Sequence, residues 1–187
     1  TREFVLGPLA EVAPDKESVL QPGYTFAQLY RQLLSSKQRP SNTQDGQDPY
    51  IFEELTDVTP EEFEQLKGIF AQLTDRPLKA DAYVGLINSE QANLYIARST
   101  QLPHRPIVGM CTLCVGRCLS GCKGWIEDVV VDKKHRGVGL GKRLLRFVHE
   151  RAKTLGVGSL ILTSAPHRVE ANGLYRSLGY ELRDTNA

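Results

Sequence analysis

Residues Trp125–Leu145 read WIEDVVVDKKHRGVGLGKRLL, passing from an apolar run through a basic turn into three glycines spaced two apart. The segment Gly124–Val131 is short and rich in β-branched side chains, which predicts a strand. Apolar side chains at positions 144, 145 and 148 recur at helical spacing and predict a helix over Gly141–Lys153. The glycines therefore lie where a strand leads into a helix.

The start of this predicted helix is suited to binding an anion. The first backbone N–H groups of a helix have no intrahelical partner, and the helix dipole adds about half a positive charge there. Basic side chains crowd the same junction, namely Lys133, Lys134, Arg136, Lys142, Arg143 and Arg146. We therefore expect the junction to hold the phosphate groups of a polyanionic ligand.

The spacing of the glycines excludes two common nucleotide-binding loops. A mononucleotide P-loop needs Ser or Thr after its Gly-Lys pair, but Arg143 follows Gly141 and Lys142 and supplies no hydroxyl for magnesium. A dinucleotide-binding loop needs Gly-x-Gly-x-x-Gly, whereas the glycines here are spaced Gly-x-Gly-x-Gly.

The pattern Arg136-x-x-Gly139-x-Gly141, placed after an acidic and apolar strand, resembles the pyrophosphate loop of the GNAT superfamily of acetyl-CoA-dependent N-acetyltransferases. A second segment, Leu162–Tyr180 (LTSAPHRVEANGLYRSLGY), resembles the downstream strand and helix of that family. The resemblance spans about Tyr50–Asn186. It implies the GNAT fold, acetyl-CoA as co-substrate and an amine as acceptor.

The resemblance also implies which residues contact the coenzyme. They are Val129, Val130, Val131, Arg136, Gly137, Val138, Gly139, Leu140, Gly141, Lys142, Asn172 and Tyr175. The strand that carries the three valines is expected to splay from the strand Ser159–Leu162. Its freed backbone groups can then pair with a ligand that carries amides at peptide-like spacing.

Three residues are candidates for catalysis. An alkyl ammonium has a pKa of about 10.4, so a base must remove a proton before the amine can attack, and Glu127 and Asp128 are the candidate bases. Strand alternation puts Trp125, Glu127 and the side chains at 129 and 131 on one face, with those at 126, 128 and 130 on the other. We therefore expect one carboxylate to face the acceptor, and favour Glu127. The resemblance implies Tyr175 as the acid that protonates the leaving thiolate.

The rest of the chain predicts an α/β (α+β mixed) class with a mixed, mostly antiparallel sheet and helices on its faces. Thr59-Pro60-Glu61-Glu62 is a capping box that opens a helix. The predicted strands are Tyr50–Leu55, Ala92–Arg98, Ile107–Val115, Gly124–Val131, Ser159–Leu162 and one from Tyr180; the predicted helices are Pro60–Leu73, Leu78–Asn88, Gly141–Lys153 and Arg168–Leu178.

We expect the chain to divide into an extension, residues 1–49, and, as the resemblance implies, a transferase domain, residues 50–187. Within the extension, Phe26–Leu34 places apolar side chains on one helical face, which must dock on the main domain or on a partner chain. The segment Ser35–Pro49 has no apolar residue and is typical of a flexible linker.

Composition narrows the class of protein. The formal net charge is +1 at pH 7, which argues against a general nucleic-acid surface. No apolar run approaches the roughly 20 residues needed to cross a bilayer, and we expect a soluble, cytoplasmic protein with no membrane partner. A homodimer paired through sheet edges is an alternative to a monomer.

All 4 cysteines lie close together, at Cys111, Cys114, Cys118 and Cys122. The first two fall in a predicted strand at an odd offset and would point to opposite faces, so we expect buried or loop thiols and no metal site. The histidines show no paired spacing with other ligands and are interpreted as surface or loop residues; they are His104, His135, His149 and His167.

Two further functions remain open beside the acetyltransferase. One is a regulatory module that binds acyl-CoA without turnover, and the other is a metal-dependent or redox switch built on the cysteines. The acceptor also stays open, because Trp-Ile-Glu-Asp-Val-Val-Val resembles glucosamine-phosphate acetyltransferases whereas Leu162–Tyr180 resembles other members of the superfamily.

Overall fold

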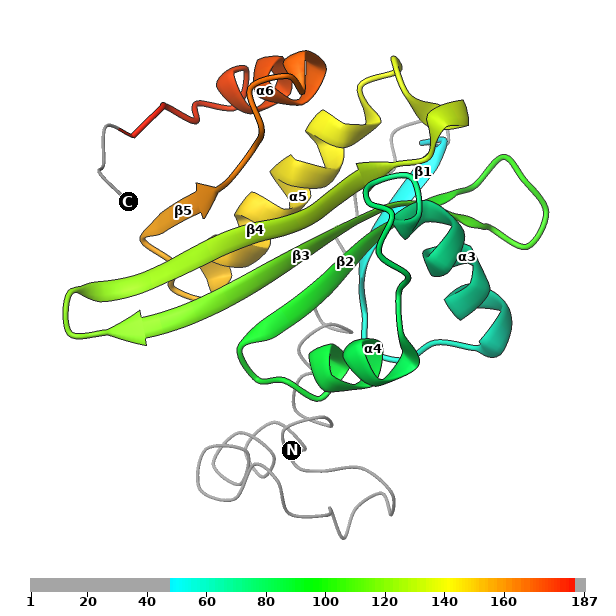
Figure 1. The fold of residues 1–187 in the computed structure, drawn as a ribbon, viewed down its shortest axis with the longest axis horizontal. Coiled ribbons are helices and arrows are strands. Elements are labelled where there is room, and N and C mark those ends of the chain that lie inside the picture. Colours follow the sequence, from blue (N-terminus) through cyan, green and yellow to red (C-terminus); the bar gives the residue numbers. More distant parts are fainter. Residues whose placement is uncertain (1–47, 184–187) are drawn as a thin grey trace, which may run out of the picture. The chain divides into compact units, whose positions relative to one another are not determined.

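The computed structural model describes residues 48–183 (Figure 1). The predicted helix Phe26–Leu34 and nearly all of the predicted linker lie outside these residues. The described elements, in chain order, are β1 (Tyr50–Leu55), α3 (Pro60–Phe70), α4 (Ala80–Ile87), β2 (Ala92–Ser99), β3 (Ile107–Cys118), β4 (Gly121–Val131), the 3₁₀ turn η1 (Lys133–His135), α5 (Leu140–Thr154), β5 (Ser159–Leu162) and α6 (Val169–Arg176).

The strands form one sheet in the order β1-β2-β3-β4-β5. The first four pair antiparallel, and β4 pairs with β5 in parallel, because α5 carries the chain back along the sheet between them. The mixed, mostly antiparallel sheet predicted from the sequence is therefore confirmed.

Helices cover both faces of this sheet (Figure 1). On one face, Leu66 and Ile69 of α3 pack with Ile96 of β2 in a buried cluster. On the other, Leu144 and Val148 of α5 are fully buried in a second cluster. Burying a leucine or valine side chain contributes about 1.5–3 kcal/mol, so the α5 stripe that the sequence predicted fixes this helix, and with it the glycine loop that precedes it.

The central hairpin is longer than the sequence predicted. Strand β3 continues to Cys118 and β4 already begins at Gly121, where the predicted strands stopped at 115 and started at 124. Gly121 has a φ of 120°, a conformation that suits glycine in a tight reversal. Residues 116–118 and 121–123, which were predicted to lie between the two strands, instead pair across the hairpin.

The helix ends also differ from prediction. The capping box at Thr59 is present, with the Glu62 N–H donating to the Thr59 hydroxyl. However, α3 ends at Phe70, three residues before the predicted end at Leu73. The chain turns there, and residues 72 and 73 line the cavity together with residues of β4. Helices α4 and α6 are likewise shorter than predicted. Residues 180–183 form no strand, and the remainder of that predicted strand lies outside the described residues.

Among the described residues, none of the helices combines the length and the apolarity needed to traverse a lipid bilayer.

Candidate active site

The sheet is open between the ends of β4 and β5. Pairing between these strands stops at Ile126 and Leu162, yet β4 runs on for five residues to Val131. The edge of β4 that faces away from β3 therefore lacks a strand partner along this segment, as the predicted splay requires. Such an edge presents backbone N–H and C=O groups that a ligand can pair with.

A backbone cradle follows β4 directly. Gly137 and Gly139 both have a φ of 79°, the left-handed region that disfavours side chains with a Cβ. Gly139 caps α5, and the first hydrogen bond of that helix runs from the Arg143 N–H to the Gly139 carbonyl (3.2 Å). The N–H groups of residues 140–142 are thus not used inside the helix and mark the anion-binding end predicted from the sequence.

Gly141 has a different reason to be glycine. A Cβ built there would lie 3.2 Å from Cδ2 of Leu174 in α6, which is tighter than ordinary van der Waals contact. The missing side chain therefore lets α6 approach the start of α5 and close one side of the site.

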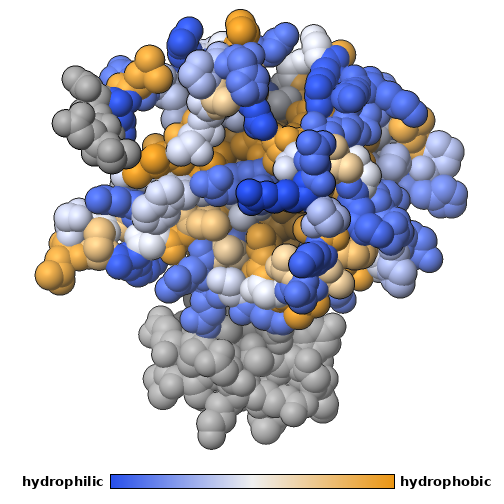
Figure 2. All heavy atoms as spheres, in the orientation of Figure 1, coloured by the Kyte–Doolittle hydropathy of each residue, from blue (hydrophilic) through white to orange (hydrophobic). Residues whose placement is uncertain are grey.

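The open strand edge, the cradle and α6 enclose a cavity of about 910 Å³. The space-filling view shows apolar atoms at the bottom of the hollow between α6 and β4, with hydrophilic atoms around its edges (Figure 2). Its lining residues are Gln72, Leu73, Val129, Val130, Val131, His135, Arg136, Gly137, Gly139, Leu140, Gly141, Lys142, His167, Arg168, Glu170, Ala171, Leu174 and Tyr175. The cavity is large enough for a ligand well above amino-acid size.

Ten of the twelve residues predicted to contact the coenzyme line this cavity; the two that do not are Val138 and Asn172. Val138 is exposed on the outside of the loop. Asn172 turns its side-chain amide to the chain before α6, where Nδ2 donates to the carbonyl of Ala165 (3.0 Å). In this arrangement Asn172 braces the segment that leads into α6.

The predicted basic cluster divides in two. Arg136 and Lys142 line the cavity, and Nε of Arg136 donates to the carbonyl of Val131 (2.8 Å). Arg143 points the other way, where it forms an ion pair with Asp48 and lies over the Phe52 ring, 5.1 Å from its centroid. Helical geometry separates neighbouring side chains by about 100°, so residues adjacent in sequence serve different faces of α5.

Several lining residues were not predicted. Gln72 ties the end of α3 to the loop after β4: its Oε1 accepts from the Lys133 N–H (2.9 Å) and its Nε2 donates to Asp132 (3.0 Å). Arg168 at the start of α6 donates to the carbonyl of Leu73, which also lines the cavity (3.4 Å). No local sequence signal marks Gln72 or Leu73, because they reach the site only through the packing of α3.

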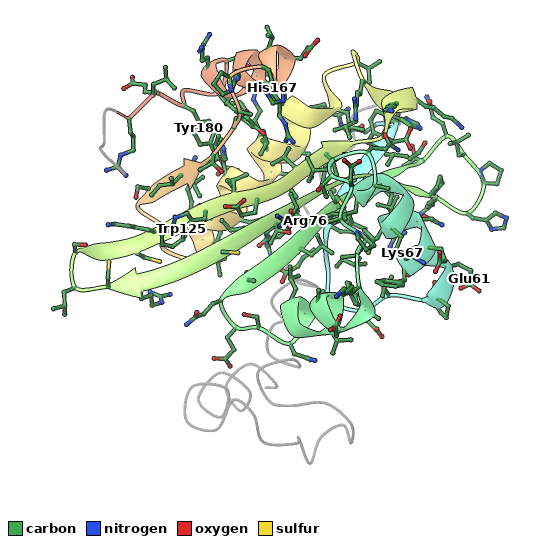
Figure 3. All side chains as sticks on the ribbon, viewed as in Figure 1. Glu61, Lys67, Arg76, Trp125, His167 and Tyr180 are labelled. Atoms are coloured by element: carbon green, nitrogen blue, oxygen red, sulfur yellow. The ribbon has the colours of Figure 1, made fainter. Side chains whose placement is uncertain are left out.

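His104 and His167 are exposed turn residues and His135 lies in the η1 turn, as expected from the sequence, whereas His149 does not fit that expectation. His135 and His167 line the cavity, and His167 is seen beside α6 in Figure 3. His149 lies within α5, half-buried, with Nε2 2.8 Å from the Tyr180 hydroxyl. The sequence analysis considered only the spacing of metal ligands, and that spacing does not show whether a histidine lies on the buried side of a helix.

A β-bulge corrects the predicted alternation in β4. Met110 pairs with Val130 and Thr112 with Glu127, so the strand has two residues, at 128 and 129, opposite the single residue Cys111. Asp128 takes a φ of 51° to accommodate the extra residue. In consequence, Ile126 packs in the α5 cluster while Val130 packs in the α3 cluster, although alternation had put them on the same face.

The bulge leaves Glu127 and Asp128 on the side of Thr112. The Thr112 hydroxyl donates to Oδ2 of Asp128 at 3.3 Å. Burial raises the pKa of Asp128, while the Thr112 hydrogen bond opposes part of that rise. Glu127 is more exposed, and partial burial together with the charge of Asp128 raises its pKa as well. The expectation that one face carries one carboxylate is therefore wrong, because the bulge resets the alternation.

Tyr175 lines the cavity from α6, as the sequence suggested. Burial raises the pKa of its hydroxyl, with a further contribution from Cys111, so the group stays protonated at neutral pH. Its ring meets that of Tyr180 edge-on, with centroids 5.9 Å apart. The Tyr180 hydroxyl is in turn paired with His149, which anchors the segment after α6 to α5.

The cysteines are free thiols in different surroundings. Cys111 is buried in the α5 cluster, and Cys118 is exposed near the hairpin tip. Within residues 48–183, no three His, Cys, Asp or Glu side chains are grouped so that they could hold a metal ion.

Comparison with known proteins adds family information. The sequence model of the acetyltransferase (GNAT) family matches residues 50–180. Glucosamine 6-phosphate N-acetyltransferase 1 of Oryza sativa subsp. japonica is 39% identical over 66 residues, 35% of this chain and 37% of that protein. Human N-acetyltransferase 8B is 39% identical over 51 residues, 27% of this chain and 22% of that protein. The matches thus span well under half the length of these curated relatives.

Solved structures share the fold at low identity. A crystal structure of an aminoglycoside acetyltransferase from an uncultured soil metagenomic sample, in complex with trehalose, superposes with a TM-score of 0.64 at 19% identity. That comparison covers 75% of this chain and 95% of the other.

Proposed function

Because the chain belongs to the GNAT family of acetyltransferases, we propose that it transfers an acetyl group from acetyl-CoA to an amine. The observation that carries this proposal is the cavity in which the edge of β4 that β5 leaves open, the N-terminus of α5 and α6 meet. We place the activity in residues 50–187, the range predicted for the transferase domain.

The cavity suits acetyl-CoA at both ends. Its strand edge, Val129–Val131, offers backbone groups to a flexible arm that contains amides. Its glycine cradle offers free N–H groups, with Arg136 and Lys142 beside them, to a pyrophosphate. Acetyl-CoA carries an amide-containing arm on one side of its pyrophosphate. The strand edge would contact the arm and the glycine cradle would contact the pyrophosphate, so the order of groups in the ligand matches their order along the cavity.

Acetyl-CoA supplies a thioester from which the acetyl group can leave. One carboxylate, Glu127 or Asp128, accepts the proton that the amine nitrogen loses as the new C–N bond forms. A backbone N–H near Val129 donates to the carbonyl oxygen while negative charge grows on it. The C–S bond then breaks, and Tyr175 gives its proton to the departing thiolate and recovers one from solvent.

The proposal can be tested by titrating acetyl-CoA into the purified chain in a calorimeter and following thiol release with amine acceptors. Glucosamine 6-phosphate is the first acceptor to try, because two sequence relatives from plants carry its name. A panel of other amino sugars, polyamines and peptides extends the screen. An Arg136→Ala, Gly139→Glu double variant should lose binding, while Lys153→Ala, exposed at the far end of α5, should bind normally.

Turnover separates the transferase from a module that only binds acyl-CoA. Tyr175→Phe should lower kcat about 100-fold or more and leave the affinity for acetyl-CoA unchanged, because general acid catalysis typically contributes about 10²–10⁴-fold. Acetyl-CoA binding by the wild type without thiol release across the whole panel would favour the regulatory module instead.

A further inference from the structure

We propose that Asp128 is the carboxylate that accepts the proton of the attacking amine, and that Thr112 is the positioning residue that holds it. This inference rests on the proposed acetyl transfer and decides between two neighbouring carboxylates, of which the sequence analysis favoured Glu127. It is carried by the bulge in β4 and by a partly buried hydrogen bond from β3.

Thr112 is a buried polar residue in the middle of β3, only 2% exposed. Its hydroxyl reaches across the strand pair and donates to Oδ2 of Asp128. A buried hydroxyl costs about 1–3 kcal/mol if it is left without a partner, so this contact also restrains the carboxylate that accepts it. The side chain of Asp128 is therefore fixed by a neighbouring strand as well as by its own backbone.

Glu127 lacks such support. Its side chain is exposed, and within the described residues it takes part in no hydrogen bond or ion pair. A group that must meet a substrate proton at about 2.6–3.2 Å gains from being held in place, since a free side chain pays entropy to reach the same position. On this ground the restrained carboxylate is the better base.

The bulge gives Asp128 its position. Its φ of 51° lies in the left-handed region, which aspartate and asparagine tolerate better than most side chains. The next residue, Val129, lines the cavity. The carboxylate is thus adjacent in the chain to the strand edge along which the acetyl donor is proposed to lie.

The charged and titratable groups around Asp128 support this role. Glu127 precedes it on β4, and the thiols of Cys111 and Cys114 on β3 are close enough to interact with it electrostatically; their pKa values are raised, largely by burial, so both are neutral at pH 7. Among the described residues no cation forms an ion pair with Asp128. Its burial favours the protonated acid, and the Thr112 hydroxyl favours the carboxylate that a base requires.

Three substitutions isolate the contact. Thr112→Val removes the hydroxyl with little change of shape, and Thr112→Ser keeps it. Asp128→Asn removes the charge while retaining a residue that accepts the left-handed backbone. Ser99→Ala is the matched control, because Ser99 is an equally buried hydroxyl residue, 1% exposed, on β2.

The measurement is kcat and KM against pH for each variant, with acetyl-CoA and the best amine of the panel. Asp128→Asn should lower kcat at least about 100-fold and more than Glu127→Gln does, with KM for acetyl-CoA unchanged. Thr112→Val should lower kcat about 10- to 100-fold and move the acidic limb of the profile to higher pH. Thr112→Ser should have nearly the wild-type kcat and the wild-type acidic limb. Ser99→Ala should change neither kcat nor the acidic limb.

A larger loss in Glu127→Gln than in Asp128→Asn, or an unmoved acidic limb in Thr112→Val, would overturn the assignment. The contact can also be tested without turnover, by carbon-13 NMR titration of the Asp128 carboxyl. The pKa of Asp128 should be higher in Thr112→Val than in the wild type, and equal values overturn the inference even if no amine is acetylated. Failure of the proposed function, in contrast, shows as wild-type protein that releases no thiol.

Discussion

The two ends of α5 allow the role of the glycine cradle to be measured. Gly139 precedes the helix with a φ of 79°, and Gly156 follows it with a φ of 75°. A Cβ at either position meets no atom within 4 Å, so alanine introduces backbone strain and no clash. Gly139 lines the cavity, and Gly156 lies at the opposite end of the helix. The two substitutions therefore share the backbone conformation and the open space around the new Cβ, and differ in their distance from the site.

The expected sizes follow from the backbone. Holding alanine in the left-handed region costs roughly 1–2 kcal/mol. Alanine also restricts the unfolded chain, which returns about 0.4–1 kcal/mol. Gly156→Ala should therefore lower the free energy of unfolding by about 1 kcal/mol. In Gly139→Ala, the unbound loop can relax to another conformation and so avoid this backbone strain. Binding of acetyl-CoA must then return the loop to the strained conformation, which weakens the affinity for acetyl-CoA by up to about 5- to 30-fold.

The assay pairs urea denaturation with calorimetric titration of acetyl-CoA on the wild type and both variants. Gly156→Ala should be destabilised yet bind normally, while Gly139→Ala should bind more weakly. Gly68→Ala, inside α3 with open space around its Cβ position, should gain about 1 kcal/mol of stability as a control of the opposite sign. Unchanged binding by Gly139→Ala, or an equal loss in Gly156→Ala, would refute the role assigned to the cradle.

Two further predictions concern stability. Arg151→Ala should lower the free energy of unfolding, measured by urea denaturation, by about 3–5 kcal/mol, because it leaves the carboxylate of Glu54 buried without this partner. The side chain of Glu54 is 6% exposed and pairs with Arg151 at 3.3 Å. Lys153→Ala, on the exposed face, is the control and should change the free energy of unfolding by less than about 0.5 kcal/mol. Burial and the nearby Lys153 lower the pKa of His149, so the unfolded chain takes up its proton first and stability falls as pH drops from 7 to 5. His149→Gln, which can still bond Tyr180, should lose less stability over that range, and an equal loss would contradict the assignment.

Much of the site follows from local sequence. The Gly-x-Gly-x-Gly spacing marked the cradle, because a glycine-rich turn before an amphipathic helix leaves few other conformations open. The strand Ser159–Leu162 was predicted with its observed bounds, since it is short, apolar and bounded by glycine and polar residues. The segment around Tyr175 was located by its resemblance to a family helix.

Other parts could not be predicted from local patterns. Gln72 and Leu73 join the cavity only because α3 packs against the sheet and ends at its edge. Arg143 leaves the basic cluster because its side of α5 faces Asp48 and the β1 rings. These placements depend on contacts between residues far apart in the chain, which no window of the sequence contains.

The sequence by itself determined the order of the elements, the mixed sheet, the glycine-rich start of α5 and the candidate residues, because periodicity and glycine spacing are local properties. The tertiary structure alone decided which carboxylate is held. One extra residue in β4 opposite Cys111 breaks the alternation, and the partner that restrains Asp128 comes from Thr112 on another strand. Register between strands is a property of their pairing, so the face that each carboxylate occupies is fixed only when the strands meet.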